Sequence, residues 1–313
     1  MSSAPRLASS GSLFARRSRT AIQLAFAVIY IVWGVSYAVN RIMALNLPPL
    51  LAAGVRFMLA GTLLAAIARA RGLALPRRRR DWQSLAAAAV LGVFLSNGLS
   101  VLALQYVASN QAALINSSSA FWLAWSGRYG RRATAVSNRT WLGLALGFTG
   151  VAVLLSARGF GAGSHIGWQL AVLTATLCWA LATAVIRESD TECDPLTFTA
   201  CYQLLGGTLL VATGLAAGES AHWVWSAAGM TAIVFLAIFS STFGFVAYTY
   251  LLVHETPARI GTYAYVNPLI AVMTGWLLLG ERLDALQIAA ALTIFAGVAL
   301  VRNLPFFPRL WRA

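Results

Sequence analysis

The residues of this sequence that could do chemistry are uncharged polar and aromatic side chains set within long apolar segments. Polar groups at mid-membrane depth are costly and often functional. Amides, hydroxyls and rings in combination favour the binding of a small amphiphilic molecule over the making or breaking of bonds. The candidates for substrate binding are Trp33, Tyr37, Asn97, Ser100, Asn116, Ser118, Trp122, Trp179, Thr183, Thr242, Tyr248, Tyr263, Tyr265 and Asn267.

An ordinary structural role is an open alternative for some of these candidates. Small hydroxyl residues such as Ser118 let membrane helices pack closely, and packing is the favoured role of Trp33 and Trp179. Asn116 and Asn267 are stronger site candidates, because an amide within lipid needs a hydrogen-bonding partner. We expect Pro268 to be structural, since a proline frees a backbone carbonyl and bends a helix.

Charged residues are almost absent from the apolar segments. Arg56 is the one charge in the interior of a segment, away from its ends. It could reach the interface, act in gating or attract a substrate carboxylate. We assign it to structure or gating. Glu281 stands with Arg282 and Asp284 between two apolar segments. We expect Glu281 at the membrane interface, where it would cap a helix or pair locally.

The sequence offers no group for proton pumping or catalysis within the apolar segments. All acidic residues and histidines lie at segment ends or in loops. Proton-driven pumps usually keep such a group in the membrane, so we expect facilitated diffusion, exchange, or coupling through an interfacial acid. No Walker A, HExxH or GxSxG motif occurs, and the three cysteines show no CxxC spacing. We expect no enzyme activity, cofactor or metal.

The elements that must position these residues are membrane helices. The 313 residues are 59% hydrophobic and only 10% charged, with a mean hydropathy of +0.73, whereas soluble domains carry about 25% charged residues. The net charge is +14, and every basic residue that contributes to it is an arginine. These arginines lie between apolar segments rather than along one face, which argues against nucleic-acid binding.

Ten apolar segments predict an all-α integral membrane protein with ten transmembrane helices in one bundle, since irregular backbone cannot face lipid. With a cytoplasmic N-terminus, only Arg41, Arg158 and Arg282 fall outside, so the positive-inside rule favours N-in and C-in. The predicted spans are 21–44, 49–68, 84–107, 110–127, 140–157, 167–187, 195–217, 227–252, 257–280 and 285–302.

The sequence also contains an internal repeat. WGVSYAVNRI at 33–42 aligns with WALATAVIRE at 179–188, and GTLL at 61–64 recurs at 207–210, both at an offset of 146. Five spans per copy is an odd number, so the copies would be inverted, as in many secondary transporters. A substrate site is then expected at the midplane between spans four and nine. The expected units are a cytosolic basic tail 1–20, a first repeat 21–157, a connector 158–166, a second repeat 167–303 and a cytosolic tail 304–313.

Several of these motifs together resemble those of a known family. They are the first-span WG, Pro48 and Pro49 followed by Arg56 and Phe57, and VNPLIAVMTGWLLLGERL at 266–283. In this combination the sequence resembles the EamA family of the drug/metabolite transporter superfamily. The resemblance implies a ten-helix carrier of the bacterial inner membrane, usually an exporter of amino acids, metabolites or toxic compounds. The first half departs from the pattern, because Ser118 stands where the second copy has Pro268.

Three functions stay open at this point. The first is a secondary transporter that exports small amphiphilic metabolites, such as amino acids, aromatic ones included, or drug-like compounds, by alternating access. The second is a carrier of phosphorylated or nucleotide-linked sugars, which would need several cavity cations where the sequence offers only Arg56. The third is a membrane enzyme or assembly factor. The expected partners are a small-molecule substrate and the lipid bilayer, not nucleic acid; the oligomeric state is open, with a monomer plausible.

Overall fold

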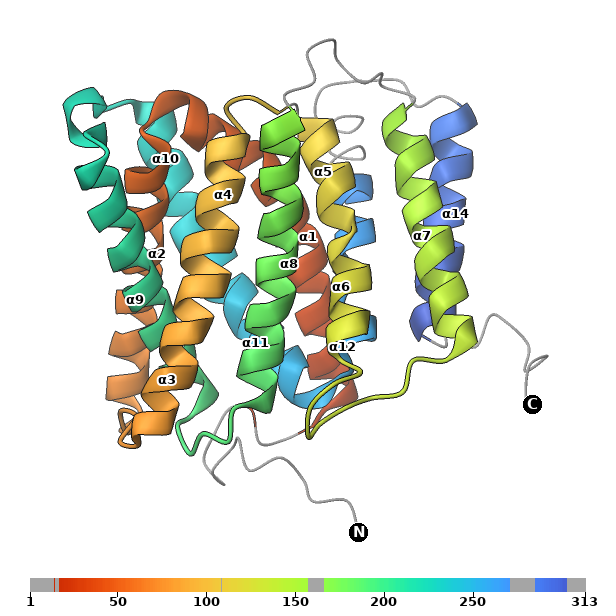
Figure 1. Cartoon of the computed structure of the whole chain (residues 1–313), viewed down its shortest axis with the longest axis horizontal. Helices are drawn as coiled ribbons and strands as arrows, with labels where there is room; N and C mark the ends of the chain where they lie inside the picture. The colour runs from red at the N-terminus through yellow and green to blue at the C-terminus, as the bar shows by residue number, and fades with distance from the viewer. Residues whose placement is uncertain (1–13, 15–16, 108, 157–165, 271–284, 303–313) are drawn as a thin grey trace.

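The computed structural model is a bundle of helices that run roughly side by side (Figure 1). The structure describes residues 14, 17–107, 109–156, 166–270 and 285–302. Every regular element in these ranges is helical, and they contain no strand. Six helices are long and apolar enough to cross a membrane, and a seventh apolar helix, Ile288–Arg302, is shorter. The chain is therefore an all-helical, multi-pass membrane protein.

The helices follow one another with short connections. The first half of the chain holds α1 (Arg19–Asn46), α2 (Pro49–Ala70), α3 (Arg79–Ala88), η1 (Ala89–Leu95), α4 (Ser96–Ala103), α5 (Ser109–Ser117), α6 (Ser119–Ser126) and α7 (Asn138–Ser156). The second half holds α8 (Ile166–Glu188), α9 (Pro195–Ala216), η2 (Glu219–His222), α10 (Ala227–Phe235), η3 (Leu236–Gly244), α11 (Phe245–His254), α12 (Pro257–Ile260), a helical stretch at 263–270 and α14 (Ala285–Arg302).

The six long helices coincide with the first, second, third, sixth, seventh and eighth predicted spans. The other predicted spans fall on α5 with α6, on α7, on the segment that begins at α12, and on α14. The fourth span is broken at Ser118, between α5 and α6. Part of the ninth span lies outside the described residues, so the count of ten stays a prediction.

α2 and α9 pack against each other in opposite directions. A Cβ on Gly54 would lie 2.6 Å from Val211 Cγ2, and one on Gly61 would lie 2.8 Å from Leu204 Cγ. Residue numbers therefore fall along α9 as they rise along α2. Such close approach needs small residues, which is how membrane helices gain packing energy without a hydrophobic driving force.

The contacts between α2 and α9 are also related by the sequence repeat. A Cβ on Gly61 would lie 3.1 Å from the carbonyl oxygen of Ala200, and one on Gly207 would lie 3.0 Å from that of Gly54. Adding the offset of 146 converts Gly61 to Gly207 and Gly54 to Ala200. Each helix thus presents the same surface to its counterpart, as a two-fold relation between the halves requires.

α7 and α14 repeat this arrangement at the other side of the bundle (Figure 1). A Cβ on Gly297 would lie 2.6 Å from the backbone nitrogen of Gly147, and one on Gly150 would lie 2.9 Å from that of Ile294. These helices are antiparallel as well. The equivalent helices of the two halves therefore meet in pairs, and the remaining helices lie between the two pairs.

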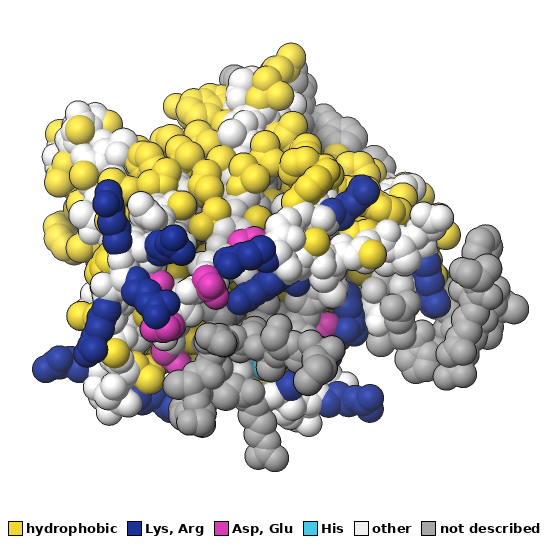
Figure 2. All heavy atoms as spheres, turned by 60° about the horizontal axis from the view of Figure 1, so that its bottom comes forward, with side chains coloured by type: hydrophobic (Ala, Val, Ile, Leu, Met, Phe, Trp, Pro, Cys, Tyr) yellow, Lys and Arg dark blue, Asp and Glu magenta, His cyan; other side chains and the backbone are white. Residues whose placement is uncertain are grey.

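One end of the bundle is rich in arginine. It is formed where α2, α6 and α8 end and α3 begins, and Figure 2 shows many arginine side chains on it. We call it the arginine-rich end. α1 begins at this end and α14 finishes there (Figure 1). Two ion pairs on this surface, Arg78 with Glu192 and Arg131 with Asp190, join exposed side chains, so each contributes little to stability.

We predict that Gly297→Ala lowers the free energy of unfolding by about 1–3 kcal/mol, because the new methyl group must push α14 away from the backbone of α7. The matched control is Gly167→Ala in α8, where an added Cβ meets nothing within 4 Å. Thermal unfolding of both variants in detergent measures the difference. Equal stability of the two would contradict the close contact between α7 and α14.

Candidate functional site

A cavity of about 150 Å³ lies within the bundle. A cavity of roughly this volume can hold a ligand of benzene's size. It extends from the middle of α1 toward the end of the bundle at which α2 begins, opposite the arginine-rich end. Its walls come from both halves of the chain. The lining residues are Trp33, Ser36, Tyr37, Asn40, Arg56, Ser96, Asn97, Ser100, Val101, Leu104, Asn116, Trp179, Ser240, Phe245, Tyr263 and Asn267.

An aromatic cluster forms the cavity floor, on the side of the arginine-rich end. Its members are Trp33, Trp179, Phe245, Tyr248 and Tyr263. The Trp33 ring centroid lies 5.0 Å from that of Tyr263, 5.3 Å from Tyr248 and 5.8 Å from Trp179. Trp33 meets Tyr263 and Trp179 edge-to-face and Tyr248 at a tilt, and aromatic pairs of this kind add to the energy of burial alone. Trp33 and Trp179 are equivalents in the sequence repeat, so the two halves meet here ring to ring.

The position of Trp33 is fixed by its neighbours on η3. The indole nitrogen donates a hydrogen bond to the backbone carbonyl of Ser240 at 3.3 Å. A Cβ on Gly244 would lie 2.4 Å from that nitrogen. Residue 244 must therefore be glycine for the Trp33 ring to occupy this place, and the floor depends on a residue that carries no side chain.

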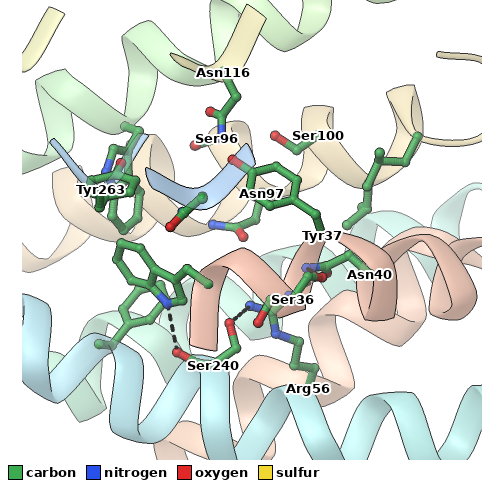
Figure 3. Close-up of a pocket in the computed structure, with 16 residues that line it drawn as sticks. Ser36, Tyr37, Asn40, Arg56, Ser96, Asn97, Ser100, Asn116, Ser240 and Tyr263 are labelled. Atoms are coloured by element: carbon green, nitrogen blue, oxygen red, sulfur yellow. Dashed lines mark hydrogen bonds between the residues drawn. The ribbon is translucent and has the colours of Figure 1, made fainter. Parts of the chain in front are cut away.

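The opposite wall of the cavity is polar and uncharged. Figure 3 shows the Tyr37 ring beside Asn97, with Ser100 and Asn116 above it and Arg56 further below. Among the described residues, the Tyr37 hydroxyl has no hydrogen-bonding partner, and the same holds for Ser100 and the Asn116 amide. These groups are free to bind a ligand or water.

The third helix of each half carries a π-helical segment beside the cavity. These segments are η1 and η3. Asn97 Nδ2 donates to the carbonyl oxygen of Gly92 at 2.8 Å, and Thr242 Oγ1 donates to that of Ala237 at 2.8 Å, both five residues back. π-bulges of this kind are frequent at functional sites. Here they leave the Asn97 amide oxygen free to face the cavity.

Arg56 enters the cavity wall from α2 and is held by three oxygen atoms. Nε donates to Ser241 Oγ at 2.8 Å, one terminal nitrogen donates to Asn40 Oδ1 at 2.8 Å, and the other reaches Ser240 Oγ at 3.5 Å. The residue is only 3% exposed. Its guanidinium therefore ties α2 to α1 and η3 with no carboxylate among its described partners.

The structure gathers more than half of the predicted site residues around this one cavity. Their side chains come from five helices that are far apart in sequence. Asn267 contributes a buried amide, whose nitrogen is oriented to donate to the carbonyl oxygens of Tyr30 and Tyr263 at 3.1 and 3.0 Å. The predicted substrate-binding residues on the lining are Trp33, Tyr37, Asn97, Ser100, Asn116, Trp179, Tyr263 and Asn267.

The other predicted residues lie off the lining. Tyr265 is fully buried, and a Cβ on Gly147 would come within 2.5 Å of its ring. Trp122 packs near Trp125, with centroids 6.4 Å apart. Ser118 lies 3.3 Å from the hydroxyl of Thr176.

Three more predicted side chains lie next to the cavity, but their hydroxyl groups bond to other groups of the protein. Tyr248 lies in the aromatic cluster but below its surface, and its hydroxyl bonds that of Thr183 at 2.7 Å. Thr242 is committed to η3. Among the residues assigned to gating or structure, Pro268 is buried in the helical stretch 263–270, Arg56 reaches the lining, and Glu281 lies outside the described residues.

Several lining residues were not predicted from the sequence. Ser36 and Asn40 lie three and seven positions after Trp33, on the same face of α1. That spacing was the available signal for them. Ser96 lies four positions before Ser100, and Phe245 lies three before Tyr248, so the same kind of spacing was available for them. Ser240 had no comparable signal, because it lies in η3, where π-helical turns shift the faces of the helix. Val101 and Leu104 complete the lining as apolar contacts.

The arginine-rich end below the floor is closed by a second set of contacts. Glu255 has a side chain only 4% exposed, and it pairs with Arg259 at 2.6 Å and with Arg17 at 3.7 Å. Tyr30 and Thr262 share a hydrogen bond of 2.7 Å between α1 and the chain after α12. A carboxylate so buried depends on its partners, because an unpaired charge there would be strongly destabilising.

Comparison with known proteins adds a family to this geometry. The profile described as the EamA-like transporter family matches residues 20–156 and again residues 166–303. A solved crystal structure superimposes with a TM-score of 0.78 over 92% of this chain and 98% of that one, at 19% identity. That likeness concerns the fold alone.

Curated relatives are similar over nearly their whole length. The inner membrane transporter YedA of Escherichia coli (strain K12) is 33% identical over 91% of this chain and 92% of its own. The transporter YvbV of Bacillus subtilis (strain 168) is 28% identical over 92% of each. A protein of Chlamydia trachomatis named as an S-adenosylmethionine/S-adenosylhomocysteine transporter is 27% identical over 86% of this chain and 88% of its own.

The names of these relatives point to transport and indicate no catalytic activity. A transporter of this kind works on a small molecule within a lipid bilayer, in agreement with the cavity and the long apolar helices. On the double match of the family profile and the identity to YedA, this chain belongs to the EamA-like transporter family and is a multi-pass inner-membrane protein.

Proposed function

We propose that this protein is a secondary transporter that exports small amphiphilic metabolites by alternating access. The substrate class is amino acids, aromatic ones included, or drug-like compounds of similar size. The observation that carries the proposal is the position of the cavity: its floor is the contact between the repeat-equivalent rings Trp33 and Trp179. Carrier sites are expected near the midplane between two repeats.

The proposed membrane arrangement has ten spans in two inverted repeats, 21–157 and 167–303, with both termini in the cytoplasm. The antiparallel pairing of α2 with α9 and of α7 with α14 supports the inversion. The profile match over 20–156 and 166–303 supports the two units. Arginine at one end of the bundle supports the orientation, with that end in the cytoplasm.

The difference between the two ends of the bundle supports alternating access. In this structure the aromatic cluster and the Glu255 contacts close the cavity toward the arginine-rich end. An inverted repeat can exchange conformations between its halves, so the opposite state would open this end and close the other. The described lining residues include no acid or histidine, which favours exchange or facilitated diffusion over proton coupling within the cavity.

Two other substrate classes can be compared with the residues that line this cavity. A carrier of phosphorylated sugars would need several cations, and Arg56 is the single cation among the described lining residues, so we do not favour it. The Chlamydia relative makes S-adenosyl compounds a second candidate substrate. S-adenosylhomocysteine belongs in the same transport assay as a competitor of L-phenylalanine.

We predict that purified protein in liposomes catalyses counterflow of labelled L-phenylalanine and that Tyr37→Phe raises its KM. The substitution removes one cavity hydroxyl, and a neutral hydrogen bond of this kind corresponds to about a three- to ten-fold change. The matched control is Tyr265→Phe, which removes a buried hydroxyl off the lining. The proposal fails if no tested amino acid, aromatic drug or S-adenosyl compound exchanges, or if both variants change KM alike.

We also predict that Glu255→Gln loosens the closed arginine-rich end, because it leaves Arg259 and Arg17 without their carboxylate. A cysteine at buried Ala258, in a background without the three native cysteines, reports this. An impermeant maleimide added from the cytoplasmic side should label it several-fold faster in Glu255→Gln. Asp190→Asn, which breaks an exposed pair with Arg131, is the control. Equal labelling rates in the two variants would count against a closing role for Glu255.

A further inference from the structure

We propose that Arg56 is the anion-binding group of the transport site, so that the substrate carries a carboxylate at one end and an apolar ring at the other. This inference rests on the proposed transport function and narrows its substrate class. It excludes neutral and purely cationic drugs as preferred substrates. It also gives Arg56 a role beyond the structural or gating one that its sequence position indicates.

The Arg56 guanidinium has more N–H donors than it has described hydrogen-bonding partners. An arginine side chain has five N–H donors in a planar fork. Three are used, on Ser241, Asn40 and Ser240, and the last of these contacts is long at 3.5 Å. Two donors are left, and Arg56 lies on the cavity lining. A planar fork with free donors is the geometry that binds a carboxylate with two hydrogen bonds.

The charge of Arg56 has no counter-charge among the described residues. The three groups that accept hydrogen bonds from the guanidinium are neutral oxygens, and its carbon lies 4.5 Å from the centroid of the Phe57 ring. No described carboxylate lies within 4.0 Å of it. A buried charge is costly unless paired, and ionisable groups within membrane helices mark substrate or ion pathways. A carboxylate is the ordinary counter-charge of a buried arginine. Here that place holds the amide of Asn40, so the counter-charge is left to a ligand.

The proposed anion site at Arg56 lies close to the aromatic cluster. Ser240 belongs to both: its hydroxyl accepts from Arg56, and its carbonyl accepts from the Trp33 indole. Figure 3 shows both contacts as dashed lines that meet at this residue. A carboxylate on Arg56 is therefore one residue away from the aromatic cluster. The substrate should have its ring a few bonds from its carboxylate, as in phenylalanine or 3-phenylpropionate.

The polar wall adds a place for an ammonium group. The amide nitrogen of Asn97 is used within its own helix, so its oxygen faces the cavity as an acceptor. Ser100 and Tyr37 supply further oxygens nearby (Figure 3). An α-amino acid could thus place its three groups on three different surfaces, while a simple arylalkanoate would use two of them.

The test compares four ligands that differ at one end. L-phenylalanine and 3-phenylpropionate carry the carboxylate; L-phenylalaninamide and phenethylamine lack it. We expect the two carboxylates to stabilise the purified protein against heat at concentrations at least about ten-fold lower than the other two, as charge-assisted hydrogen bonds require. Equal effects of all four, or no effect of either carboxylate, overturn the inference.

Asn40→Asp provides a variant that keeps the shape of the site. It places a carboxylate where the Asn40 oxygen lies, 2.8 Å from the guanidinium, and so occupies the charge internally. We expect the preference for carboxylates to be lost. Thermal stability reflects both the new ion pair with Arg56 and the loss of the hydrogen bond that Asn40 Nδ2 donates to the Ser36 carbonyl oxygen. Asn46→Asp makes the same change six residues further along α1, at an exposed position, and should leave the preference intact. An unchanged preference in Asn40→Asp overturns the inference.

The outcomes separate this inference from the proposed function. If the liposomes exchange phenylalanine and phenethylamine equally well, transport stands and the carboxylate site is refuted. If the Asn40→Asp variant no longer binds carboxylates yet still binds phenethylamine, the carboxylate site stands, and the counterflow of phenylalanine decides the transport function separately. Arg56→Lys completes the set, because it keeps the charge but removes the planar fork. It should weaken both carboxylates and leave phenethylamine unaffected; an equal loss for all ligands would assign Arg56 a purely structural role.

Discussion

The constraint on which this structure depends is the absence of water inside the bilayer. Polar groups within the bundle therefore gain from partners in the protein, in a ligand or in cavity water. Arg56 shows the constraint most clearly, because three oxygens from α1 and η3 hold its guanidinium in place but none of them neutralises it. The residue thus serves the fold through its hydrogen bonds and leaves its charge available. The groups that position the guanidinium are therefore not the groups that would neutralise its charge.

The same constraint explains why the helices meet through glycine. Lipid tails are as apolar as leucine, so helices gain from contact only where backbones come close. At Gly61 and Gly207, and at Gly147 and Gly297, equivalent helices of the two halves approach to the limit that backbone atoms allow. These tight pairs stand at the two sides of the bundle. The helices between them carry the larger side chains, and there a cavity with an aromatic floor can form.

Much of this architecture follows from the sequence, while the rotation of individual helices does not. Hydropathy and the 146-residue offset predicted the helical class, the repeat and cavity residues such as Trp33 and Asn97. Tyr265 lies off the cavity although Tyr263 lies on it, because two residues along a helix point in very different directions. A soluble helix reveals its inner face by polarity; here both the lipid and the neighbouring helix are apolar, so that signal is weak. Ser240 was missed for a related reason: a π-helical turn shifts the face on which it lies.

A neutral support for a buried arginine suits a carrier better than an ion pair would. An internal carboxylate would compete with each incoming substrate, and the charge would be satisfied whether or not a ligand was present. With Asn40 and two serines as partners, the guanidinium is positioned without an internal carboxylate, and under the proposal above its counter-charge would come from the ligand. Ser240 then joins the anion site to the Trp33 indole and, through it, to the ring of Trp179 in the other half. Occupation of the charge site and packing of the floor thus involve one shared residue, at the contact where the two halves would have to separate for the cavity to open toward the arginine-rich end.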